Sequence, residues 1–266
     1  MWEPVKIEEY TKDRLINDLG GDIGSQLYAI YILTRKNLVE DILPHIRAIQ
    51  PDLTDHGPDH IKNVLNNAEK LLGNDINNLR PLELYLLIMV IIFHDAGNIF
   101  DREDHQHKIA QIYEYARPAP RDLQEKKLIL RAVSAHCGET EEGSKDTLKD
   151  LDENNNLHGH PVALRKIAAI LRFADELAEG PHRTSKFIEM TGGYPDSSKI
   201  YHQYADITGI SIDRGLSRIA LTYHIDLDKN GNNFDFSKSD ALFHLLDFTY
   251  KRIIKLNEER LYARYY

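Results

Sequence analysis

The sequence predicts a mainly α-helical protein: a helical bundle followed by a small C-terminal β-hairpin. Three observations carry this prediction. Between residues 59 and 73, apolar side chains recur at helical spacing. The segment 81–93 is apolar almost without interruption, which indicates a helix that is buried on every side. Between 210 and 225, apolar residues alternate on both sides of the turn-like segment "DRG", which is typical of a hairpin.

Helix start and stop signals place the other elements. Proline favours the first turn of a helix and glycine follows its end, so we expect a helix that begins at Pro161 and ends near Gly180. The polar, acidic segment 138–160 is expected to be an exposed insertion, and residues 1–20 to be a lead-in without an assigned element. Further helices are expected at about 25–48, 104–116, 121–136 and 239–262.

The chain shows no internal repeat and no low-complexity linker, so we expect a single domain over residues 1–266. Its helical core would span about residues 25–180, and the hairpin and terminal helix about residues 200–266. The terminal helix is expected either to complete the core or to form a dimer contact, which leaves a homo-oligomer open. Its apolar residues are Phe243, Leu246, Tyr250, Ile253 and Ile254.

Composition and charge restrict the class of partner. Hydrophobic residues make up 42% of the 266 residues and charged residues 28%, which is ordinary for a globular protein. The formal net charge of −9 argues against long nucleic acid as a partner, because its backbone needs a basic surface. A small phosphorylated substrate remains compatible with this charge, since bound cations can reverse the local field.

The sequence favours a cytoplasmic protein that does not contact membranes. It has one cysteine, Cys137, so no internal disulfide is expected. The segment "MWEPVKIEEYTKD" lacks the apolar stretch of a signal peptide. The longest apolar run, 84–93, is too short to cross a bilayer.

Histidine and aspartate residues lie in phase with the apolar faces of their helices. Residues four apart share a helical face, as His60 does with Val64 and Asp175 with Leu171. A single inward histidine is more often a core residue with a satisfied ring, so helical phase alone leaves both interpretations open. The residues expected to point inward are His60, His94, Asp95, His105, His136 and Asp175.

This donor set is suited to divalent metals. Neutral imidazole and carboxylate groups bind Mn, Fe, Co, Ni or Zn, and Mg is a further candidate. Six inward ligands are more than one ion uses while it keeps an open position, so we expect one or two ions. In a two-metal site, a carboxylate bridges the ions and a bridging water becomes hydroxide near neutral pH.

The order of these residues resembles that of the HD-domain superfamily of metal-dependent phosphohydrolases. The resemblance is carried by "DHIKNV" with His60, "IIFHDAGN" with His94 and Asp95, and "LRFADE" with Asp175, and it covers about residues 50–180. It implies an HD-domain-like helical bundle. Further histidines, His105 in "REDH" and His136 in "SAHCG", stand where two-metal members are expected to have theirs.

The resemblance also implies a role for each ligand. His60, His94 and Asp175 would hold one metal, His105 and His136 the other, and Asp95 would bridge them. Two-metal relatives often have a His-His pair where this chain has His136 followed by Cys137, so the chain departs from their pattern at the second metal position. The glycine-tyrosine-proline signature of the cyclic dinucleotide branch is absent as a unit; "GGYP" at 192–195 stands in the wrong place.

Other polar residues are candidates for the same site. His56, in "TDHGPDH", could contact the substrate or support a ligand, or simply lie in a loop. Arg102 and Arg183 could hold phosphate oxygens, although a surface salt bridge is the more common fate of an arginine. Glu176 could accept a proton or orient a ligand, and Asp95 would hold the nucleophile.

The function implied by the resemblance is hydrolysis of a phosphoester or phosphoanhydride bond. The substrates would be nucleotides, cyclic nucleotides or oligonucleotides, and the acidic composition favours a small nucleotide. Two alternatives remain open: a metal-dependent nuclease acting on single strands, which would need a basic groove, and a non-catalytic module that senses nucleotides.

Overall fold

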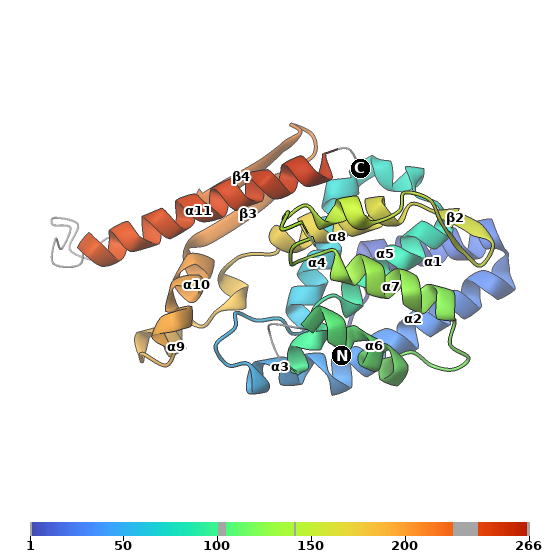
Figure 1. The fold of residues 1–266 in the computed structure, drawn as a ribbon, viewed down its shortest axis with the longest axis horizontal. Helices are drawn as coiled ribbons and strands as arrows, with labels where there is room; N and C mark the ends of the chain where they lie inside the picture. Colours follow the sequence, from blue (N-terminus) through green and yellow to red (C-terminus); the bar gives the residue numbers. More distant parts are fainter. Residues whose placement is uncertain (1, 101–104, 141, 226–238, 265–266) are drawn as a thin grey trace.

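The computed structural model describes residues 2–100, 105–140, 142–225 and 239–264. Helices dominate, and the strands form two small antiparallel sheets, so the predicted mainly α-helical fold with a C-terminal hairpin is confirmed. Figure 1 shows a helical body at one end, with a helix and the C-terminal hairpin extending from it.

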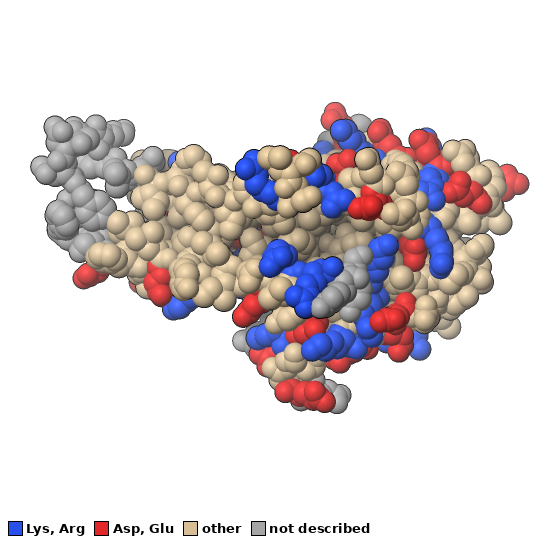
Figure 2. All heavy atoms as spheres, turned by 90° about the horizontal axis from the view of Figure 1, so that it is seen from above, with Lys and Arg blue, Asp and Glu red and all other residues tan. Residues whose placement is uncertain are grey.

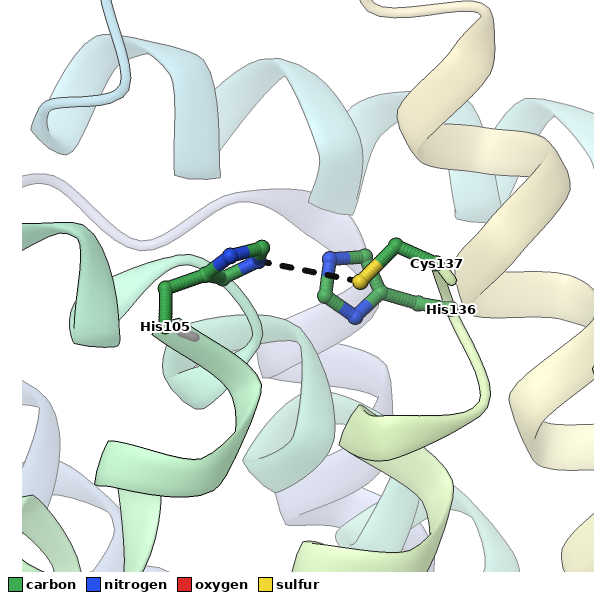
Figure 3. Close-up of side chains that lie close together, drawn as sticks. All are labelled: His105, His136 and Cys137. Atoms are coloured by element: carbon green, nitrogen blue, oxygen red, sulfur yellow. Dashed lines mark hydrogen bonds between the residues drawn. The ribbon is translucent and has the colours of Figure 1, made fainter. Parts of the chain in front are cut away.

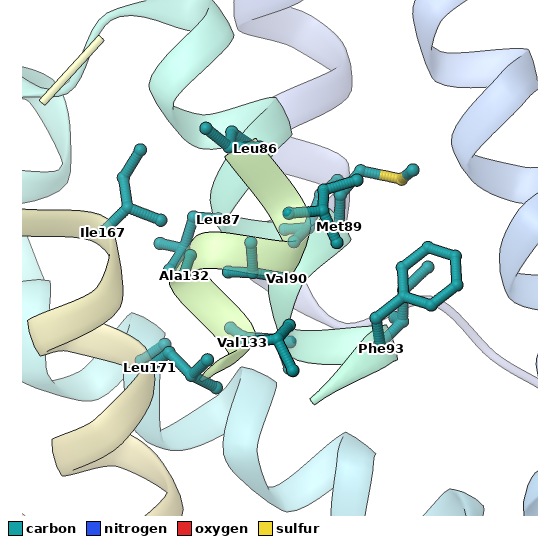
Figure 4. Close-up of a cluster of buried hydrophobic side chains, with 14 of the residues drawn as sticks. Leu86, Leu87, Met89, Val90, Phe93, Ala132, Val133, Ile167 and Leu171 are labelled. Atoms are coloured by element: carbon teal, nitrogen blue, oxygen red, sulfur yellow. The ribbon is translucent and has the colours of Figure 1, made fainter. Parts of the chain in front are cut away.

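The core is organised around helix α5 (Pro81–Phe93), in which every residue from Leu82 onward is buried. This confirms the interpretation of the apolar run as a fully enclosed helix. Figure 4 shows α5 side chains such as Leu87 and Val90 beside residues of two neighbouring helices. The helices that surround α5 are α1 (Lys6–Leu19), α2 (Gly21–Asp41), α4 (Pro58–Leu72), α7 (Leu123–Ser134) and α8 (Leu164–Glu176).

The same segment is the one candidate for a membrane-spanning helix among the described residues. Extended through the following turn, Pro81–Ile99 is long and apolar enough to cross a membrane, but 94% of its most apolar window is buried inside the molecule. It is therefore accounted for as the central core helix.

The expectation of a lead-in at residues 1–20 was wrong, because α1 belongs to the core. Ile7 and Leu15 are fully buried, and α1 packs against α2 and α5. The helical signal was obscured because Glu8 is also buried. Its carboxylate accepts a hydrogen bond from Tyr31 at 2.6 Å and pairs with Arg35.

Two further expectations need correction. The helix expected at 25–48 is two helices, α2 and α3 (Leu43–Ile49), and Pro44 stands in the first turn of the second. The segment 138–160 is not simply exposed, because buried Leu148, Leu151 and Leu157 anchor it. It contains the 3₁₀ turn η3 (Thr147–Asp150) and strand β1 (Asn155–Leu157), which pairs with β2 (His160–Val162).

The C-terminal part contains the predicted hairpin. Strands β3 (Thr208–Asp213) and β4 (Arg218–Tyr223) pair with Ile210 opposite Leu221. Two helices before it were not expected: α9 (Lys186–Met190) and α10 (Asp196–Ile207). The other elements are the 3₁₀ turns η1 (Gly73–Asn78), η2 (Ala96–Ile99) and η4 (Pro181–Arg183), and helices α6 (His105–Ala116) and α11 (Ser239–Ala263).

The five apolar residues of α11 that were expected to complete the core do not do so, whereas Tyr262 and Ala263 at the end of this helix pack against it. This helix packs against α8 and α10, but Phe243 and Tyr250 are 66% and 63% exposed, and Leu246, Ile253 and Ile254 are exposed as well. Figure 2, a view from above, shows few charged side chains at the left end of the molecule, toward which α11 extends. Of the two roles expected for this helix, completing the core or forming a dimer contact, the dimer contact remains a prediction.

Candidate metal centre

The six predicted ligands come from different helices and meet in one buried place. His60 stands in the first turn of α4, and Asp175 in the last turn of α8. His94 and Asp95 follow the end of α5, so the apolar helix delivers this pair directly into the interior. His105 begins α6, and His136 follows α7.

Close backbone packing brings α6 to Asp95. A Cβ added at Gly97 would lie 1.9 Å from the carbonyl oxygen of His105, so only glycine allows η2 to approach the start of α6 this closely. Asn98, in the same turn, donates a hydrogen bond to Asp95 Oδ1 at 3.1 Å. The close packing at Gly97 and the hydrogen bond from Asn98 to Asp95 together fix the position of His105 relative to Asp95.

A first group of donors comprises His60, His94, Asp95 and Asp175, whose ligand atoms all lie within 4.8 Å of one another. His60 Nε2 is 3.1 Å from Asp175 Oδ1 and 3.3 Å from Asp95 Oδ2. His94 Nε2 is 3.1 Å from Asp95 Oδ2 and 3.6 Å from Asp175 Oδ1. Donors that share one ion at about 2 Å are separated by about 3 to 3.5 Å, so these spacings fit a single cation.

The hydrogen-bonding state of the imidazoles supports this assignment. His94 Nδ1 lies 2.7 Å from the carbonyl oxygen of Ile91, so Nδ1 donates to this carbonyl and Nε2 faces the carboxylates, where it could bind a metal once it is deprotonated. Within the described residues, the buried Nε2 atoms of His60 and His94 have no hydrogen bond of acceptable geometry. Buried polar atoms are rarely left so, and a metal ion would satisfy both.

A second group comprises His105, His136 and Cys137, and Figure 3 shows the three side chains facing one another. Cys137 Sγ lies 3.8 Å from His105 Nε2. His105 Nε2 and His136 Nε2 are each 3.7 Å from Asp95 Oδ1. Asp95 thus directs Oδ2 toward the first group and Oδ1 toward the second, which is the arrangement of a bridging carboxylate.

The two buried carboxylates and their neighbouring imidazoles shift one another's pKa values. Burial opposes ionisation of Asp95 and Asp175, but neighbouring imidazoles hold the pKa of each carboxyl well below its usual range. Burial also opposes the imidazolium form of His94, yet the charge of Asp95 and bonds to both carboxylates raise its pKa to about 9. Burial would raise the pKa of the Cys137 thiol, but His136 and His105 lower it to about 5. Protons on these imidazoles therefore balance part of the charge of the buried carboxylates.

The two groups open into a cavity of about 570 Å³. Asp95, His105, His136 and Asp175 line it, together with His56. The lining also carries cationic side chains from separate elements (Lys145, Arg172, Arg183, Arg252 and Lys255) and the carboxylates of Asp52, Glu176, Glu179 and Glu259. Each of these cations is paired with a carboxylate, so an anion that entered the cavity would meet a lining of mixed charge in which guanidinium and ammonium groups are already held in place.

The other predicted site residues lie around this cavity where the structure describes them. His56 is buried, and its Nε2 is 3.9 Å from Asp95 Oδ2 and 3.0 Å from Arg183 Nη2. Arg183 also donates to the carbonyl oxygen of Asp55 at 3.0 Å. Glu176 pairs with Arg252 at 2.9 Å and with Lys255 at 2.7 Å. Arg102 lies outside the described residues.

The sequence interpretation missed several residues of the site. Asn98 could have been found, since it stands three residues after Asp95 and such pairs contact each other in a helical turn. Lys145, Tyr201 and Lys255 had no local signal, because they reach the cavity through the folding of distant segments. Residues 200–266 therefore contribute to the cavity, although no role was assigned to them.

The helical body and the His/Asp cluster define an HD-type domain with a candidate metal site. The HD-CE family model matches residues 50–230, more than half of the chain. The chain therefore belongs to the HD-CE family, an HD-type domain family. No curated protein and no solved structure matches it.

Proposed function

We propose that this protein is a metal-dependent phosphohydrolase that acts on a small phosphorylated substrate, such as a nucleotide, a cyclic nucleotide or a short oligonucleotide. The observation that carries the proposal is the position of Asp95 between two donor groups, in a cavity whose lining includes arginine and lysine side chains. Membership of an HD-type family supports the hydrolytic class.

The donor groups would hold one or two divalent ions from among Mn, Fe, Co, Ni, Zn and Mg. Such ions supply Lewis acidity and an activated water. The chain's own residues would orient the substrate: Arg183 and Lys255 face the cavity and would bind phosphoryl oxygens as charge develops there. His56 would act beside Arg183 on the substrate, and Glu176 would accept or return a proton.

The test is turnover by metal-loaded protein on a panel of nucleoside monophosphates and triphosphates, cyclic nucleotides and short single-stranded oligonucleotides. We expect hydrolysis of small nucleotides, loss of it in Asp95→Asn, and a raised KM in Lys255→Ala. Lys251→Ala is the matched control, because Lys251 stands on the same helix and pairs only with exposed Asp247 among the bonds that the structure describes.

The panel also separates the alternatives. Cleavage of a long single strand, added to the panel, in preference to all the small substrates would indicate a nuclease, and tight binding without turnover would indicate a sensing module. Either result would contradict the proposed activity. A cytoplasmic location fits the proposed substrates and is tested by cell fractionation, while size-exclusion chromatography with light scattering tests whether the exposed face of α11 forms a homo-oligomer.

A further inference from the structure

The second donor group has a chemical composition different from the first. The first group offers two imidazoles and two carboxylates. The second offers two imidazoles and the sulfur of Cys137, with Asp95 Oδ1 beside both histidines at 3.7 Å. His105 and His136 are only 5% and 8% exposed, so both imidazoles are held on most sides by the protein where they line the cavity with Cys137.

The positions of the atoms fit coordination by sulfur. A tetrahedral ion bound to sulfur at about 2.3 Å and to nitrogen at about 2.1 Å places the two donors about 3.6 Å apart. The distance between Cys137 Sγ and His105 Nε2 is 3.8 Å. A hydrogen bond between the Cys137 thiol and the His105 imidazole would explain this one distance. It would not explain why His136 Nε2 and Asp95 Oδ1 converge on the same place.

The orientation of His136 supports the same conclusion. Its Nδ1 lies 2.5 Å from the carbonyl oxygen of Val133. Nδ1 therefore donates to this carbonyl, and Nε2 points toward Asp95, as it does in His94. Both histidines are thus prepared as Nε2 ligands by a backbone carbonyl three residues earlier.

We propose that Cys137 supplies a thiolate ligand to the second metal position, together with His105, His136 and Asp95. Thiolate is a soft donor, so this position would select Zn²⁺, Co²⁺ or Fe²⁺ over Mg²⁺ and Mn²⁺. On binding, the sulfur–metal bond replaces the S–H bond and the proton leaves to solvent. The inference rests on the metal dependence of the proposed function, but not on its substrate or on turnover.

Cobalt spectroscopy tests this directly, because Cys137 is the only cysteine of the chain. Any thiolate-to-cobalt charge-transfer band in the near ultraviolet must therefore arise from this residue. We expect metal-free protein titrated with Co²⁺ to bind two ions, with the band developing as the second position fills. Binding of two ions without the band, or of only one ion without the band, would overturn the proposal.

Three variants sharpen the result. Cys137→Ser should abolish the band and weaken the second ion by at least the ~10–100-fold that the loss of a supporting partner costs. Cys137→His should keep the second ion without the band, which also serves if the serine variant fails to fold. Asp175→Asn, which alters only the first group, should keep the band. Unchanged affinity for the second ion in Cys137→Ser would contradict the proposal.

The readout separates this inference from the proposed function. A charge-transfer band in protein that hydrolyses none of the panel substrates would leave the thiolate site standing and remove the hydrolase. Turnover without the band would support the hydrolase and remove the thiolate site.

Discussion

His60 Nε2 lies 3.1 Å from Asp175 Oδ1, although the two side chains come from opposite ends of different helices, the start of α4 and the end of α8. His60 is completely buried, and Asp175 faces the cavity. The pair therefore joins the core of the helical body to the space in which a substrate would bind.

Because this donor group exists only in the folded chain, metal binding should stabilise the fold. At a metal concentration about 100 times the Kd, the gain is about 2.7 kcal/mol, which corresponds to a rise in Tm of roughly 5–10 °C for a chain of this size. Asp175→Asn should remove most of this shift, since the amide lacks the negative charge. Thermal unfolding of metal-free protein with and without Mn²⁺ or Zn²⁺ measures it.

The control for that experiment is Asp52→Asn. Asp52 lines the same cavity but belongs to neither donor group, so its variant should keep the full metal-dependent shift. An equal shift in Asp175→Asn and in the wild type would show that Asp175 is not a ligand.

Metal binding should also depend on pH, with affinity rising toward alkaline pH. In the metal-free protein His94 is an imidazolium at pH 7.5, with a second proton on Nε2, because the carboxylates outweigh burial and raise its pKa to about 9. A metal ion must displace this proton, so apparent affinity should rise by up to about tenfold per pH unit per displaced proton and level off above about pH 9.

Calorimetric titration in buffers of different ionisation enthalpy measures the protons released. We expect release of about one proton or more per ion at pH 7.5, and less as the pH approaches 9. An affinity that stays constant between pH 6.5 and 8.5 would mean that His94 is not a metal ligand.

Helical phase could predict ligands within helices, because His60 shares the apolar face of α4 with Val64, and Asp175 shares that of α8 with Leu171. His94, Asp95 and His136 stand just beyond the ends of α5 and α7, and the phase of those helices continues into them. The position of Lys255 could not be predicted in this way. It lines the cavity only because α11 packs against α8, and no pattern within α11 indicates that contact. Buried Glu8 hid the core role of α1 for a similar reason, since its partner Arg35 belongs to another helix.

Gly97 is expected to control the second donor group through the backbone. Gly97→Ala places a Cβ where the carbonyl oxygen of His105 now lies, so the start of α6 must move away from Asp95. We expect the second ion to weaken by about 10–100-fold, as for loss of a supporting contact, with a smaller effect on the first. Titration with Co²⁺ resolves the two ions.

Gly21→Ala is the matched control, because a Cβ there would meet nothing within 4 Å. Equal weakening of both ions in Gly97→Ala would indicate general disruption of the fold and would contradict a specific role at His105.

The buried pair between Arg172 and Glu259 should anchor α11 to the helical body. Arg172 Nη2 donates to Glu259 Oε1 at 2.9 Å, and both residues are at least nine-tenths buried. Removing one partner leaves a buried charge uncompensated, so Glu259→Gln should lower the free energy of unfolding by about 3–5 kcal/mol. On the same helix, Asp247 pairs with Lys251 at the surface, and Asp247→Asn should cost at most about 1 kcal/mol. Urea denaturation of both variants measures the difference, and equal losses would show that the buried pair does not fix α11 in place.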